Sequence, residues 1–160
     1  MKVLLIQPPI QDFYQTPTRI QPIGLAYLAA SLKANGYEVE ILDAQKKKRK
    51  TIPFPPELFY LREFYPDYDR SPFKLYTHYY HFGLDWEEIK ERIKNSRAEV
   101  FGISSLFTPY QAEALKIARI IKEWDKGKIV VFGGANASTR PIEILQNPEV
   151  DYVIIGEGEK

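Results

Sequence analysis

The chain has 160 residues, with 22 lysines and arginines against 21 aspartates and glutamates, and no cysteine. This length predicts a single domain, and the balanced charge argues against nucleic acids and anionic membranes as partners. The lack of cysteine excludes disulfides, thiolate metal sites and cysteine nucleophiles.

The amino-terminal stretch "MKVLLIQPPI" carries one lysine and a short apolar run that two prolines interrupt. Such a run is too short for a signal peptide or a membrane span. Together with the absence of cysteine, it leads us to expect a cytoplasmic protein.

Five short apolar runs have the length of β-strands, and most are apolar on both alternating faces. They span residues 2–6, 38–42, 99–104, 128–132 and 151–155. Strands that are apolar on both faces are typical of parallel sheets covered by helices on both sides.

Helical patterns lie between these runs. The first covers Pro22–Asn35, with leucines and an alanine spaced along one face, and ends at Gly36, a natural left-handed cap. A second begins at Asp85, which can form a capping box with Glu88. A third opens with Thr108 as its cap and Pro109 in the first turn, and a short fourth follows Pro141.

Alternating strands and helices predict an α/β fold with a doubly wound, parallel five-stranded sheet, flavodoxin-like or Rossmann-like, in the strand order 2-1-3-4-5. Ligands of such sheets bind beyond the carboxyl ends of the strands, near the point where the strand order reverses. This topology brings four loops to one rim, namely the segments "QPPIQDFYQTPTRIQ", "SLFTP", "GGANAST" and "GEGE".

The strand and helix pattern is interrupted by an insertion after the second strand, residues 46–84. It begins with the basic run "KKKRK", which acidic residues soon balance, so a solvated surface is a better interpretation than a nucleic-acid patch. The insertion holds eleven of the chain's 22 aromatic residues. We expect it to pack on this domain or on another one, with a short helix over "PPELFYLREFY".

Two short motifs follow consecutive strands. Gly133 and Gly134 permit either the close approach of a ligand or a tight turn, and Ser104 suits either a ligand or a helix cap. Taken together, Ser104-x-Leu106 and the glycine pair 26 residues later resemble the second and third parts of the cobalamin-binding signature. This resemblance implies a slot between the two loops into which the nucleotide tail of the cofactor inserts, away from the corrin ring.

The resemblance extends over "PIGLAYLAASLKANGYEVEILDA", "VFGISSLFTPY", "VVFGGANAS" and "VDYVIIGEGE". Together these segments look like the amino-terminal cobalamin-binding domain of radical S-adenosylmethionine enzymes, over about residues 1–45 and 85–160. In that family a Rossmann-like module holds cobalamin against a following barrel, where an iron-sulfur cluster cleaves S-adenosylmethionine, and some members are methyltransferases. The cluster needs three cysteines, so the resemblance implies that this chain is the cofactor domain of a longer enzyme, without catalytic residues of its own.

The cofactor-binding residues that strand-end position and the resemblance imply all lie on the predicted rim. They are Pro8, Pro9, Ser104, Ser105, Leu106, Phe107, Thr108, Gly133, Gly134, Ala135, Asn136, Gly156, Glu157 and Gly158. Two roles stay open: Phe107 lies either against the corrin or beneath the third helix, and the "GEGE" glutamates either bind a ligand or are solvated.

The chain departs from the wider cobalamin family at two places. The loop after the first strand lacks the Asp-x-His-x-x-Gly motif whose histidine coordinates cobalt, so no protein ligand to cobalt is predicted. Asn136 stands where the glycine loop often has histidine. The two histidines, His78 and His81, lie in the insertion, where packing is a better interpretation than a metal site completed by Asp67, Asp69 or Asp85.

Two other classes of function remain open. One is a scaffold or interaction domain of a radical enzyme that has lost cobalamin binding. The other is an unrelated phospho-acceptor or nucleotide-binding protein, against which Gln7, Ser104 and the Pro8-Pro9 pair argue because they replace the acidic cluster or glycine loop it needs. We also expect an apolar patch beside "VDYVII", where a further helix would cover the sheet, and hence self-association.

Overall fold

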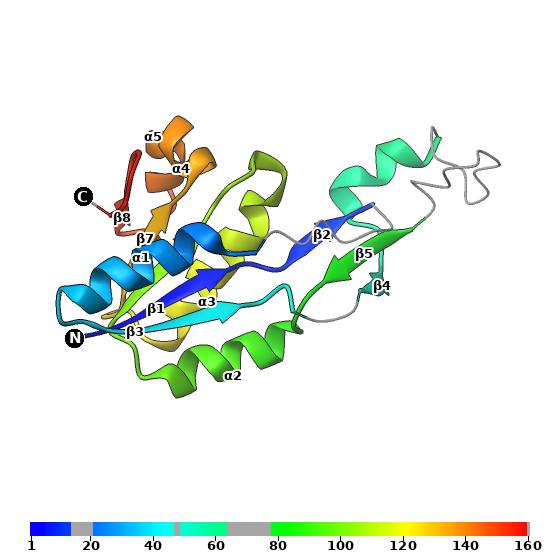
Figure 1. The fold of residues 1–160 in the computed structure, drawn as a ribbon. Coiled ribbons are helices and arrows are strands. Elements are labelled where there is room, and N and C mark those ends of the chain that lie inside the picture. Colours follow the sequence, from blue (N-terminus) through cyan, green and yellow to red (C-terminus); the bar gives the residue numbers. More distant parts are fainter. Residues whose placement is uncertain (14–20, 47–48, 64–77, 160) are drawn as a thin grey trace.

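The main body of the protein is a five-stranded parallel sheet with helices on both faces (Figure 1). The computed structural model describes residues 1–13, 21–46, 49–63 and 78–159, with residues 61–63 described in backbone only. The strands of this sheet are β1 (Lys2–Gln7), β3 (Glu38–Asp43), β6 (Val100–Ser104), β7 (Ile129–Gly133) and β8 (Tyr152–Val153).

The strands lie in the order β3-β1-β6-β7-β8, and every neighbouring pair is parallel. This is the predicted order 2-1-3-4-5, so the α/β, flavodoxin-like fold class is confirmed. The order reverses between β1 and β6, where the chain leaves β1 for β3 on one side and returns to β6 on the other. The carboxyl ends of β1, β6 and β7 therefore form the expected place for a ligand.

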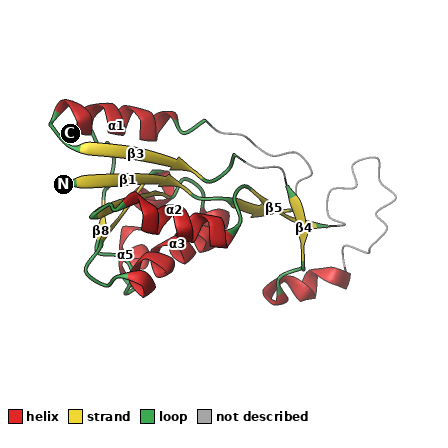
Figure 2. Ribbon diagram, turned by 90° about the horizontal axis from the view of Figure 1, so that it is seen from below, coloured by secondary structure: helices red, strands yellow, loops and turns green. Residues whose placement is uncertain are grey.

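Helices cover the two faces of the sheet unequally (Figure 2). On one side lies α1 (Ile23–Ala34), and on the other lie α2 (Trp86–Ser96), α3 (Gln111–Trp124) and the short α5 (Pro141–Leu145). The larger hydrophobic core is on the side of α2 and α3, with Phe101 and Phe132 fully buried. The smaller core under α1 gathers around Leu5 and Val39.

Helix ends agree with the sequence in part. Gly36 has φ +83° directly after α1, which confirms the predicted left-handed cap. Asp85 precedes α2 without making a side-chain capping hydrogen bond, so the predicted capping box is wrong. The predicted cap by Thr108 is also wrong, because residues Thr108–Tyr110 form a 3-10 turn before α3 and the Thr108 hydroxyl bonds elsewhere.

A second, antiparallel sheet lies beyond the carboxyl end of β1, and the sequence did not reveal it (Figure 1). It consists of β2 (Ile10–Asp12), β5 (Tyr79–Phe82) and β4 (Lys50–Ile52), in the order β2-β5-β4. The sequence predicts a rim loop for the segment after β1, because it follows the carboxyl end of a strand in the predicted sheet. The segment forms strand β2 because it pairs with β5 of the insertion, and its local sequence pattern does not indicate this pairing.

The insertion packs partly as expected. Residues Pro56–Glu63 form a 3-10 helix where a short helix was predicted, and Phe54 contacts Phe13 and Tyr79 at ring-centroid distances of 5.0 and 6.2 Å. Its central part, residues 64–77, lies outside the described residues. Within the described part of the chain, no helix combines the length and the apolar character needed to cross a membrane.

Candidate functional site

The loops after β6 and β7 are joined by backbone hydrogen bonds. Ser104 pairs with Gly133 in the sheet, and the Ser105 amide donates to the Gly133 carbonyl at 2.8 Å. The Asn136 amide in turn donates to the Ser105 carbonyl at 3.1 Å. The serine loop and the glycine pair therefore lie side by side, as the predicted slot requires.

The two glycines differ in why the chain needs them. Gly134 has φ +105°, and a Cβ there would lie 2.8 Å from the Ser105 carbonyl oxygen. The fold itself therefore demands glycine at this position. Gly133 has no positive φ, and a Cβ there would meet nothing within 4 Å. The space in front of Gly133 is free for another molecule.

Asn136 connects the two loops through its side chain. Its amide nitrogen donates to the Ser105 hydroxyl and to Gln111 Oε1, each at 2.9 Å, and its Oδ1 accepts from the Thr108 hydroxyl at 2.9 Å. Asn136 is 3% exposed and lies on α4 (Ala135–Thr139), a single helical turn where we expected a loop. Ser105, Thr108 and Asn136 thus satisfy one another's hydrogen-bonding groups and connect the loops after β6 and β7.

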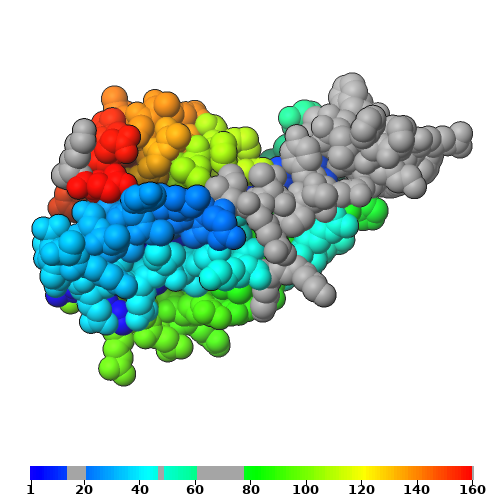
Figure 3. All heavy atoms as spheres, in the orientation of Figure 1, coloured from blue at the N-terminus to red at the C-terminus, as the bar shows by residue number. Residues whose placement is uncertain are grey.

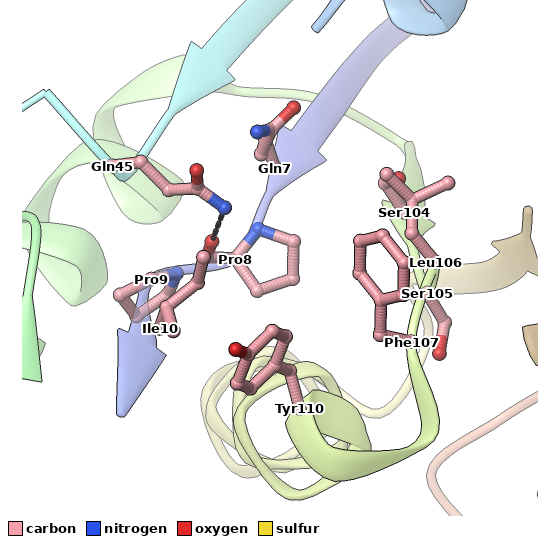
Figure 4. Close-up of a pocket in the computed structure, with 10 residues that line it drawn as sticks. All are labelled: Gln7, Pro8, Pro9, Ile10, Gln45, Ser104, Ser105, Leu106, Phe107 and Tyr110. Atoms are coloured by element: carbon pink, nitrogen blue, oxygen red, sulfur yellow. Dashed lines mark hydrogen bonds between the residues drawn. The ribbon is translucent and has the colours of Figure 1, made fainter. Parts of the chain in front are cut away.

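A small pocket opens between the ends of β1 and β6, and we call it the rim pocket (Figure 4). Its lining residues are Gln7, Pro8, Pro9, Ile10, Gln45, Ser104, Ser105, Leu106, Phe107 and Tyr110. The rings of Pro8, Phe107 and Tyr110 face one another, and Gln45 Nε2 donates to the Pro8 carbonyl at 2.9 Å. Its volume of about 30 Å³ holds little more than a water molecule. Phe107 is 49% exposed, so it is not beneath α3.

A larger hollow, which we call the sheet groove, lies between α1 and the face of the sheet. Its lining residues are Leu5, Gln7, Gln21, Pro22, Ile23, Gly24, Leu25, Leu28, Gly102, Ile103, Ser104, Leu106, Val131, Gly133, Gly134, Ile154, Gly156, Glu157, Gly158 and Glu159. Its volume of about 380 Å³ falls within the usual range for small-molecule sites.

The groove has an apolar floor and a more polar mouth. Leu5, Gly102 and Val131 are aligned across β1, β6 and β7 and form the floor. Two residues further along the strands, and therefore on the same face, Ser104 and Gly133 form the edge of the mouth.

The walls of the groove come from α1 and from the end of the chain. Leu25 and Leu28 line it from α1, and Ile154 lines it from the segment after β8. A Cβ at Gly158 would lie 3.7 Å from Leu28 Cδ1, which places the Gly156–Glu159 turn against α1. Figure 3 shows this contact from outside, with the red carboxyl-terminal segment against the blue helix.

The predicted site residues fall into three groups. Four residues line only the rim pocket, namely Pro8, Pro9, Ser105 and Phe107. The second group lines the sheet groove: Ser104, Leu106, Gly133, Gly134, Gly156, Glu157 and Gly158, of which Ser104 and Leu106 line both. Thr108, Ala135 and Asn136 line neither. Of the "GEGE" turn, Gly156 is held by its amide, which donates to the Ser138 hydroxyl at 2.9 Å.

Sequence reasoning missed the floor and the α1 wall of the groove. Counting back two residues from Ser104 and Gly133 would have found Gly102 and Val131, because alternate residues of a strand share a face. Leu25 and Leu28 belong to the apolar face that the sequence predicts for the first helix, and the structure leaves them only partly buried.

A buried acidic residue lies in the first turn of α3, three residues after the rim-pocket residue Tyr110. Glu113 on α3 is 6% exposed, and its Oε2 has no hydrogen-bond partner. Burial raises the pKa of Glu113 to about 7, with a smaller contribution from the charge of Asp12. Asp12 Oδ2 accepts a hydrogen bond from the Tyr110 hydroxyl at 2.5 Å. Burial, with the charges of Glu113 and Asp12, also raises the pKa of Tyr79.

His81 is a packed core residue, and its role as a ligand has no support. It is 1% exposed, with Nε2 2.7 Å from the Leu84 carbonyl and Nδ1 3.2 Å from Gln11 Nε2. Burial lowers the pKa of His81, so the ring is held neutral. Among the residues that the structure describes, no three histidine, aspartate or glutamate side chains gather as a metal site. Asp67 and Asp69 lie outside those residues.

Two comparisons with known sequences identify relatives of this chain. The family model of the B12 binding domain matches residues 73–160, which include both loops of the groove mouth. A cytidylyl-2-hydroxyethylphosphonate methyltransferase from Streptomyces wedmorensis is 30% identical over 159 residues, which are 99% of this chain. The chain spans only 26% of the length of that relative.

Solved structures show the same fold in another setting. The response regulator protein TrrA from Thermotoga maritima matches with a TM-score of 0.50 over 97% of this chain and 85% of its own. The two sequences are 11% identical, so the likeness concerns the fold alone.

Proposed function

Because the chain belongs to the B12-binding domain family, we propose that it binds cobalamin at the carboxyl ends of β1, β6 and β7. In this proposal the nucleotide tail enters the sheet groove between Ser104 and Gly133, and the corrin lies over the rim near Pro8 and Phe107. The observation that carries it is the open space in front of Gly133, at the mouth of a groove of about 380 Å³.

The residues of the groove fit such a tail. Backbone without a side chain borders the mouth at Gly133 and Gly156, and the Ser104 hydroxyl can bond a ribose or phosphate oxygen there. The apolar floor suits the flat base at the end of the tail, which gains by leaving water. The Phe107 ring, which is 49% exposed, offers apolar contact to the corrin edge, whereas Pro8 is buried and lines the rim pocket.

We propose further that the chain supplies no histidine to the cobalt. The loop after β1 contains prolines in place of a histidine, and both ring nitrogens of His81 are engaged, by Gln11 of the second sheet and by the Leu84 carbonyl. When bound, cobalamin supplies a cobalt centre that can carry a one-carbon group. The chain's own residues would bind, orient and shield the cofactor.

For the complete protein we propose only a class of reaction. The relative from Streptomyces wedmorensis is named a methyltransferase, and this chain matches about a quarter of it, 26% of its length. With the resemblance of the four quoted segments, this supports a cobalamin domain joined to a radical S-adenosylmethionine domain that holds the iron-sulfur cluster. The complete protein would then be a methyltransferase.

An absorption titration of the purified chain with hydroxocobalamin tests the central proposal. Binding should shift the corrin bands, because the axial surroundings of the cobalt change, and the shift should saturate at one corrinoid per chain. Unchanged bands together with no retention of corrinoid on gel filtration would instead favour the alternative, an interaction domain that does not bind cobalamin.

A further inference from the structure

We infer that the sheet groove selects among corrinoids by the polarity of their lower base, and that it favours benzimidazole or phenolic bases over adenine. This inference rests on the proposed function, and it concerns the chemistry of the groove floor. Natural corrinoids share the corrin and the nucleotide linkage but differ in this base, so the protein can distinguish them through the residues that the base touches.

The floor offers a base no hydrogen-bond partner. Its three residues, Leu5, Gly102 and Val131, have apolar side chains or none. The three strands that carry them are hydrogen-bonded neighbours in the parallel sheet, so their backbone amides and carbonyls are used by the ladder. The walls above, at Leu25, Leu28 and Ile154, are aliphatic as well.

Of the polar residues that line the groove, Ser104 and Gln7 lie at its mouth, and Gln21, Glu157 and Glu159 line it from the segments before α1 and after β8, so none of them is on the floor. Ser104 is two residues beyond Gly102 on β6, about 7 Å further along the strand. Gln7 stands at the same level on β1, two residues beyond Leu5. Since the base is the far end of the tail, the ribose and phosphate stay beside these polar groups while the base reaches the floor.

Adenine and dimethylbenzimidazole differ at the place that would meet this floor. The six-membered ring of adenine carries ring nitrogens and an amino group, whereas that of dimethylbenzimidazole carries only carbon, hydrogen and two methyl groups. A buried hydrogen-bonding group without a partner weakens binding by about tenfold or more. We therefore expect cobalamin to bind at least about tenfold more tightly than pseudocobalamin, the corrinoid with adenine as its base.

Release of the base from cobalt predicts the opposite order. A base must leave the cobalt before it enters the groove, and dimethylbenzimidazole coordinates cobalt more strongly than adenine does. Release alone would thus favour pseudocobalamin. A corrinoid with p-cresol as its base has no nitrogen to coordinate cobalt, so its binding involves no release of the base from the metal. It should therefore bind at least as tightly as cobalamin, and its affinity measures the contact between base and groove alone.

Equilibrium dialysis of the protein with cobalamin, pseudocobalamin, the p-cresol corrinoid and cobinamide, which lacks the nucleotide, tests the inference by corrin absorbance. Cobinamide should bind more weakly than cobalamin. Pseudocobalamin binding as tightly as cobalamin, or cobinamide binding equally well, would overturn the inference while leaving cobalamin binding intact. Failure of all four to bind would overturn the proposed function as well.

Variants then locate the selection on the floor. Val131→Thr keeps the shape of the side chain and adds a hydroxyl, so it should reduce the preference for cobalamin over pseudocobalamin by about threefold or more. Ile129→Thr makes a similar change on the same face of β7, two residues below and outside the groove, and should leave the preference unchanged. Should Val131→Thr fail to fold, Leu28→Gln places an amide in the α1 wall. An unchanged preference in the folded groove variant would overturn the assignment.

Discussion

The side chain of Asn136 donates a hydrogen bond to the Ser105 hydroxyl at 2.9 Å, and this bond joins the loops that follow β6 and β7. The same amide group also donates to Gln111. Because the residue is buried, this network determines how the two loops stand relative to one another at the mouth of the sheet groove. The residue that replaces the family's frequent histidine here is therefore a structural connection.

Asn136→Ala should lower the free energy of unfolding by about 2 kcal/mol, because it removes the hydrogen-bond partner of the buried Ser105 hydroxyl and of the part-buried Gln111. Chemical denaturation followed by circular dichroism measures this loss. Asn95→Ala, on the exposed side of α2, is the matched control and should stay within about 0.5 kcal/mol of the unmodified protein. Equal stability of the two variants would contradict the role of the network.

Glu113 should make the protein less stable as the pH rises. Burial raises its pKa to about 7 from an ordinary 4.5, so the folded protein binds this proton more tightly than the unfolded chain does. The stabilisation that comes from this proton is fully present below pH 4.5 and is lost as the pH rises through about 7. The free energy of unfolding should fall by about 3 kcal/mol over this range.

Glu113→Gln should remove this dependence. The variant should become more stable than the unmodified protein near pH 8 and lose that advantage near pH 5. The lowered pKa of His81 acts in the opposite direction, since its contribution is lost as the pH falls below 6.5, but it is common to both proteins. The same pH profile in both proteins would contradict the assignment to Glu113.

How far the sequence predicted the fold depends on how local the signal was. The strands of the main sheet contain apolar runs, for example residues 3–6 of β1, and their alternation with helices left few topologies. β2 and β4 are three residues each, and they are strands because β5 pairs with them across the insertion. No window of sequence contains that pairing. β8 is likewise shorter than its apolar run, since only Tyr152 and Val153 pair with β7.

The sequence predicted residues at the mouth of the candidate site but not the floor and the α1 wall of the sheet groove. Ser104 and Gly133 belong to motifs that can be recognised, and the structure brings them together. Asn136 lies in a helical turn because the chain turns sharply at Gly134, close to the Ser105 carbonyl. This contact between two loops cannot be read from the sequence. The groove itself depends on how α1 lies over the sheet, which only the packed structure defines.

Phe54→Ala should loosen the second sheet. The Phe54 ring contacts Phe13 and Tyr79, and aromatic contacts of this kind add to the burial of apolar area. Local opening should become easier by about 1–2 kcal/mol, so that trypsin cleaves at Arg49 about tenfold faster. Tyr27→Ala removes an exposed ring from α1 and should leave the rate unchanged. Equal cleavage rates in both variants would show that this aromatic cluster does not hold the sheet.

The residues at the end of the last strand should promote self-association. Tyr152 and Ile155 are 60% and 65% exposed, which agrees with the apolar patch expected from the sequence. Light scattering over a concentration series should therefore show association that Tyr152→Lys and Ile155→Lys reduce. The control Tyr27→Lys introduces the same charge on α1 and should not change it. Strictly monomeric behaviour of the unmodified protein would contradict this prediction.

Gly133 tests the account most directly, because it is a position where the fold does not need glycine but a bound tail does. Gly133→Val places a side chain in open space at the mouth of the groove, whereas Ala30→Val adds two of the same three carbon atoms on the exposed side of α1. Equilibrium dialysis with hydroxocobalamin, after circular dichroism has shown both variants folded, measures the consequence. We expect Ala30→Val to bind like the unmodified protein and Gly133→Val to bind at least about tenfold more weakly, since a blocked mouth excludes the tail. Unaltered binding by folded Gly133→Val would contradict the account.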